Sequence, residues 1–81
     1  MTESQQRMAR ALAQVTFCPG IGTKRFAREM AHHAEHQPDR EITDRQAKYL
    51  REAVVRYRRQ IPQEVVLLAK AEIAAVEAVT A

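Results

Sequence analysis

The chain is poor in the residues that build turns, crosslinks and aromatic cores. Its 81 residues include two glycines and three prolines, too few for the hairpin turns that a sheet protein needs. Cys18 is the single cysteine, which excludes an internal disulfide and favours a reducing compartment. With no tryptophan and 5% aromatic residues, aliphatic side chains must fill the interior. We therefore expect a helical fold with a thin core, of the kind that oligomerisation often supplements.

Long apolar runs are also absent. No stretch reaches the length of a membrane span, and polar residues 1–6 lack the apolar segment of a signal peptide. We expect a cytoplasmic protein without membrane contact. A hydrophobic content of 46% is ordinary for a globular chain, and this length allows one core. Residues 1–81 are therefore predicted to form a single domain.

Helix start signals divide the first half of the chain. Thr2 and Gln5 form a Thr-x-x-Gln capping box, which predicts a helix over about 3–15. A Pro-Gly pair and a further glycine then indicate a turn. Thr23 is placed to cap a second helix, which should end before the polar, proline-containing stretch 37–41.

The second half carries the clearest boundary. Thr43 and Gln46 form another capping box, and the helix that follows is predicted to run over about 44–60. Pro62 ends or kinks that helix and suits the first turn of a fourth, over 63–80. The apolar stripe of the third helix steps by three and four residues through Ala47, Leu50, Val54, Tyr57 and Ile61.

These elements predict an all-α fold, a compact bundle of three to four short helices with its core in 3–61. The expected core residues are Leu12, Phe26, Met30, Leu50, Val54 and Tyr57. The C-terminal helix 63–80 is apolar on more than one side, wider than the stripe of about 100° that a surface helix buries. We therefore expect self-association through it, most simply as a two-fold homodimer. The predicted interface residues are Val65, Leu68, Ile73 and Val76.

Basic charge is concentrated in the middle of the chain. The formal net charge is +3, divided as +1 over 1–22, +4 over 23–62 and −2 over 63–81, which favours an anionic partner for the middle. Arg45, Lys48, Arg56 and Arg59 line one side of the third helix with Glu52, and arginine pairs well with phosphate oxygens. The candidate anion-binding residues are Lys24, Arg25, Arg28, Arg45, Lys48, Arg51, Arg56, Arg58 and Arg59. Tyr49 and Tyr57 can stack on bases, although Tyr57 fits the core better. The alternative is a solvated surface whose charges pair with Glu29, Glu35 and Glu41.

Metal binding and catalysis have weaker support. Cys18, His32, His33 and His36 have chemistry suited to zinc, but a structural site usually has four ligands and a close cysteine pair. We expect no metal and no other cofactor. A helical chain this small offers little enclosed volume for a substrate, so we expect neither an enzyme nor a small-molecule site. Residues 19–24 lack the spacing and the preceding strand of a phosphate loop, although a glycine-rich turn before a helix can hold an isolated phosphate.

Four short motifs carry a family resemblance: Phe17-x-Pro-Gly, Lys24-Arg25-Phe26, Ile42-Thr43-x-x-Gln46-x-x-x-Leu50 and Arg56-Tyr57-Arg58-Arg59-Gln60-Ile61. Together they cover roughly residues 17–61. The pattern resembles small uncharacterised proteins of phages and prophage-bearing bacteria, and similar segments occur beside nucleic-acid-processing domains. The resemblance implies no catalytic residue.

Two functions follow from these features. The first is non-enzymatic binding of an anionic partner, nucleic acid (DNA or RNA) before an acidic protein surface, through the basic third helix. The second is a phage-type protein-interaction module, an inhibitor or accessory protein of a host protein, that docks through the apolar C-terminal helix. Phosphate binding weakens steeply with salt, whereas apolar docking barely changes, so a salt titration separates the two.

Overall fold

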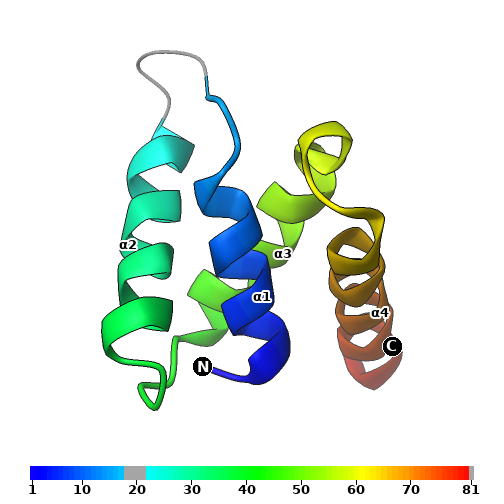
Figure 1. The fold of residues 1–81 in the computed structure, drawn as a ribbon. Coiled ribbons are helices and arrows are strands. Elements are labelled where there is room, and N and C mark those ends of the chain that lie inside the picture. Colours follow the sequence, from blue (N-terminus) through cyan, green and yellow to red (C-terminus); the bar gives the residue numbers. More distant parts are fainter. Residues whose placement is uncertain (18–21, 81) are drawn as a thin grey trace.

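Every regular element in the described part of the chain is helical. The computed structural model describes residues 1–17 and 22–80, and Figure 1 shows the helices running alternately up and down. The elements are α1 (Glu3–Ala13), α2 (Gly22–His36), α3 (Asp44–Arg56), the short 3-10 turn η1 (Arg58–Gln60) and α4 (Gln63–Thr80). The predicted all-α bundle is confirmed. The predicted turn at Pro19 and Gly20 lies outside the described residues.

Capping boxes start α1 and α3, as the sequence predicts. The backbone N–H of Gln5 donates to the Thr2 hydroxyl at 3.1 Å, and the Gln5 side chain accepts from the Thr2 N–H at 3.0 Å. Thr43 and Gln46 repeat both bonds at the same distances. Each box satisfies two N–H groups that a helix start leaves without an intrahelical partner.

Two predicted boundaries are wrong. Helix α2 begins at Gly22, so Thr23 lies inside its first turn instead of capping it. Helix α3 ends at Arg56, four residues early. The reason lies at Ile61, whose backbone is extended (φ −117°, ψ 140°), because a residue before proline is disfavoured in the α region. Ile61 is buried, as its place in the predicted apolar stripe indicates, but it lies beyond the end of α3.

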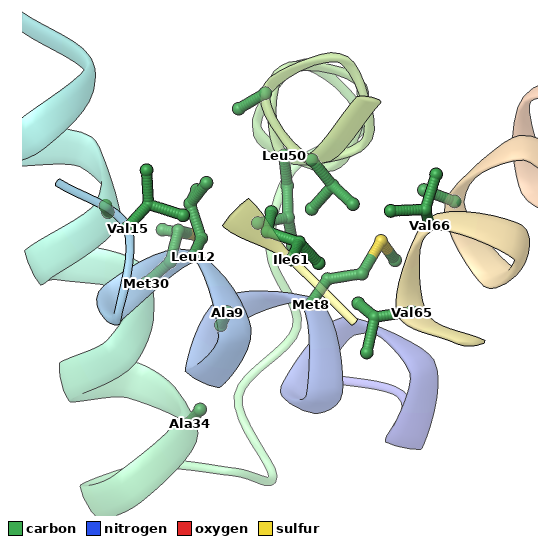
Figure 2. Packing of buried hydrophobic residues seen from close by; sticks show 14 residues of the cluster. Met8, Ala9, Leu12, Val15, Met30, Ala34, Leu50, Ile61, Val65 and Val66 are labelled. Carbon is green, nitrogen blue, oxygen red and sulfur yellow. The ribbon is translucent and has the colours of Figure 1, made fainter. Parts of the chain in front are cut away.

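The core draws on all four helices, and α1 contacts each of the others. Its largest fully buried side chains are Met8, Leu12, Met30, Leu50 and Val54, several of which Figure 2 shows converging between the helices. Four of the six predicted core residues are therefore buried. The other two, Phe26 and Tyr57, are half-buried at the edge of this cluster.

Helix α4 divides its apolar residues between two sides. Val65, Val66 and Ala69 are buried with the core, in contact with α1 and α3. Much of the outward side is alanine: Ala71, Ala74, Ala75 and Ala78 are exposed. Because alanine presents little apolar area, α4 exposes less apolar surface than its apolar content indicates.

No helix in the described residues combines the length and apolar character of a membrane crossing.

One predicted interface residue needs correction. Val65 is only 6% exposed and packs into the core of its own chain, so it is not available to a partner. Leu68 and Ile73 are half-buried, whereas Val76 is 44% exposed. Leu67, which the predicted interface omits, is 56% exposed.

Candidate anion-binding surface

Charged side chains are sorted between the two ends of the bundle. At one end α2 and α4 begin and α3 and η1 finish (Figure 1). We call this the basic end, residues 22–25 and 56–64. Its charged side chains are Lys24, Arg25, Arg56, Arg58, Arg59 and Glu64. Five cations against one carboxylate give this end a net charge of +4.

The opposite end carries the reverse charge. It comprises residues 1–4, 35–45 and 74–80, and we call it the acidic end. Its charged side chains are Glu3, Glu35, Asp39, Glu41, Asp44 and Glu77, together with Arg40 and Arg45. Six carboxylates against two cationic side chains give a net side-chain charge of −4, and the N-terminal ammonium of Met1 lies at the same end. The bundle is therefore strongly polarised along its length.

The nine predicted anion-binding residues do not form one face. Lys24 and Arg28 line a hollow between α1 and α2, whereas Lys48 and Arg51 line another between α3 and α4. Arg45 lies at the acidic end. The predicted row from Arg45 to Arg59 fails because α3 ends at Arg56 and Arg59 belongs to η1. The basic end keeps five of the nine: Lys24, Arg25, Arg56, Arg58 and Arg59.

Few of these cations have an acidic partner among the described residues. Arg7 pairs with Glu3 and Arg25 with Glu29, and the neighbouring side chains of His36 and Glu35 come within 3.9 Å, a contact that is ionic only when the imidazole is protonated. Arg25 and Glu29, whose side chains are 3.7 Å apart, are neighbours on α2, so this pair does not involve the third helix, for which surface pairing is the predicted alternative. None of the basic residues of α3 or η1 takes part in these pairs. At the basic end, Arg56, Arg58 and Arg59 are exposed to solvent.

The arginines of η1 sit on an anchored turn. The Gln60 side chain accepts from the Thr16 N–H at 2.9 Å and donates to the Thr16 carbonyl at 3.3 Å. Beside this pair, the rings of Phe17 and Tyr57 meet edge to face, 4.8 Å between centroids. The Arg58 guanidinium donates to the Val55 carbonyl at 3.3 Å. These contacts hold the turn against the end of α1.

A second feature of this region joins α2 to α3. Thr23, Tyr49, Glu52, Ala53 and Arg56 line a hollow of about 200 Å³, which we call the tyrosine hollow. Thr23 is 5% exposed, and its hydroxyl lies 2.9 Å from the Tyr49 hydroxyl. No local sequence pattern brings these two residues together, since they are 26 positions apart. The sequence offers Tyr49 as a candidate stacking residue but does not predict its surroundings.

The histidines do not assemble a metal centre within the described residues. The rings of His32 and His36 are 4.7 Å apart, but no group of three or more histidine, cysteine, aspartate or glutamate side chains there is placed to hold a metal. Cys18, the other candidate ligand, lies outside the described residues. The expectation of no metal therefore stays a prediction.

Comparison with known proteins finds no matching family model, no matching curated protein and no matching solved structure. The chemistry of the surface must therefore supply the functional argument. Exposed guanidinium groups, a hydroxyl pair and one accessible ring suit the binding of anions and flat polar groups.

Proposed function

We propose that the chain is a non-enzymatic binding module for an anionic polymer, nucleic acid first, which it contacts through the basic end. The observation that carries this proposal is the separation of side-chain charge, +4 at one end and −4 at the other. A field of this shape orients the molecule toward a polyanion before contact. It also keeps the acidic end away from the phosphates.

The binding energy in this proposal comes from counterion release and charge-assisted hydrogen bonds. Arg56, Arg58 and Arg59 lie within four consecutive residues, on and beside a turn held by Gln60. Each phosphate that an arginine neutralises frees condensed cations from the nucleic acid. With about four such contacts, the logarithm of affinity should fall with the logarithm of salt with a slope of about −3.

Charge reversal at matched positions tests the proposal. Arg56→Glu with Arg59→Glu should abolish oligonucleotide binding in low salt and leave the helical circular dichroism unchanged, because neither side chain is buried. Arg40→Glu with Arg45→Glu makes the same change in net charge at the acidic end and should lower affinity only slightly. The measurement is fluorescence anisotropy of a labelled oligonucleotide. Equal losses in the two variants would show that net charge alone matters.

The second candidate function is a protein-interaction module, and exposed Leu67 and Val76 on α4 favour it. In this proposal the outward side of α4 docks on a second copy of the chain or on a host protein, as a phage-type inhibitor or accessory protein would. Leu67→Glu should then convert a dimer to a monomer by light scattering, with little response to salt. A wild-type chain that is monomeric at high concentration would remove the homodimer.

A further inference from the structure

An accessible tyrosine ring lies next to the basic end. Among the described tyrosine and phenylalanine residues, Tyr49 is the one that is exposed, at 42%, while Phe17, Phe26 and Tyr57 are half-buried. An exposed ring beside cations is the combination that proteins use to bind single strands, because stacking and phosphate contacts act together. Tyr49 and Arg56 line the same tyrosine hollow.

The ring of Tyr49 is held in place before any ligand arrives. Phe26 meets it edge to face, with 4.4 Å between centroids and 66° between planes. The Thr23 hydroxyl, itself buried, lies 2.9 Å from the Tyr49 hydroxyl. A ring fixed from both its side and its tip loses little conformational entropy when a flat group stacks on it.

The lining of the tyrosine hollow is chemically mixed. Arg56 offers hydrogen-bond donors and Glu52 offers acceptors. A carboxylate at this place disfavours a phosphate group, whereas the edge of a nucleobase presents donors and acceptors together. The hollow therefore suits a base better than a second phosphate.

A base can reach this position only when it is unpaired. In a duplex, neighbouring base pairs cover both faces of each base, so an aromatic side chain finds no face to stack on without unstacking the helix. The geometry points to single-stranded nucleic acid as the ligand, with one unpaired base in the tyrosine hollow and its neighbouring phosphates on Arg56, Arg58 and Arg59. This inference rests on the proposed function and narrows it to one class of nucleic acid.

Intrinsic fluorescence provides a direct test. The chain has two tyrosines and no tryptophan, so the Tyr57→Phe variant leaves Tyr49 as its single strong emitter. This variant is titrated with a single-stranded oligonucleotide, with the duplex of the same sequence and with polyphosphate, a polyanion without bases. Stacking should quench Tyr49 emission with the single strand and leave it nearly unchanged with the other two.

Substitution of the ring completes the test. Tyr49→Leu should weaken single-strand binding about 5- to 100-fold, the range expected when one stacked base is lost, and leave polyphosphate binding unchanged. Tyr49→Phe keeps the ring and should stay within about threefold of the parent. Circular dichroism of both variants checks that the bundle is folded.

Two outcomes overturn the inference in different ways. If duplex and single strand bind equally and Tyr49 emission does not respond, the single-strand inference is wrong while the proposed function stands. If none of the three polyanions binds in low salt, the proposed function itself is wrong.

Discussion

Helices α3 and α4 bury their inner sides in the same core but differ in what they present outward. Leu50 and Val54 of α3 and Val66 of α4 belong to one cluster. The exposed side of α3 carries Arg45, Lys48, Glu52 and Arg56, whereas that of α4 carries Leu67, Lys70, Ala71, Ala74 and Ala78. The comparison shows that high apolar content in a helix does not by itself predict an interface. What matters is the size of the apolar side chains that remain exposed, and four of the six described in α4 are alanine.

The largest expected effect is on the free energy of unfolding, and it distinguishes the buried Leu50 from the exposed Leu67. Leu50→Ala in α3 should cost about 2–5 kcal/mol in the free energy of unfolding, because its side chain is fully buried. Leu67→Ala in α4 should change it by about 0.5 kcal/mol or less. Urea denaturation measures both. Similar midpoint shifts for the two variants would show that the outward side of α4 is covered.

A smaller effect is expected within α4 itself. Val65→Ala removes two buried methyl groups and should cost about 1–3 kcal/mol. The matched change at Val76, which is 44% exposed, should cost about 0.5 kcal/mol or less. Denaturation midpoints again provide the comparison. A larger loss of stability for Val76→Ala would mean that the side of α4 with Val76, and not the side with Val65, faces the core.

The starts of the two helices give the next comparison. Thr43→Ala removes the hydroxyl that accepts from the Gln46 N–H and should destabilise the fold by about 1 kcal/mol. Gln63→Ala, at the exposed first position of α4, should have almost no effect. Thermal unfolding followed at 222 nm measures the difference. A neutral Thr43→Ala would mean that packing alone fixes the start of α3.

The smallest expected effect concerns metal. A chelator such as EDTA should leave the melting temperature unchanged, because His32 and His36 supply only two ligands and a structural zinc site needs about four. Differential scanning calorimetry with and without added zinc measures this. A large drop on chelation that zinc restores would bring Cys18 and the histidines back as a metal centre.

Local signals allowed most of the fold to be predicted. Thr2 and Thr43 start helices because each cap depends on a residue three positions away, which a sequence displays directly. The end of α3 was harder to predict. Pro62 disfavours the helical conformation at Ile61, so the helix stops early although the helical spacing of apolar residues continues to Ile61. The partial burial of Phe26 and Tyr57 depends on how the helices cross, which spacing does not specify.

The candidate site was predicted less well, because it is a product of topology. Arg45 and Arg56 belong to one helix, yet they lie at opposite ends of the bundle once its direction is known. The charges can be sorted into two ends only after the helices are seen to alternate. Likewise, the contact between Thr23 and Tyr49 spans 26 residues and has no sequence signal. The sequence displays the charged and aromatic residues directly, but their grouping at two ends of the bundle could not be predicted from it.

The alanines of α4 have a consequence for the chain when it is not folded. Alanine has the highest intrinsic helix propensity, and α4 is 18 residues long, beyond the roughly 12–15 residues below which isolated helices are marginal in water. This segment should therefore keep part of its helix after the core is lost. The unfolded ensemble would then show residual helical ellipticity that comes from the C-terminal quarter of the chain. During folding, α4 would already be partly helical when α1 and α3 come together, and it could pack against them without first forming its helix.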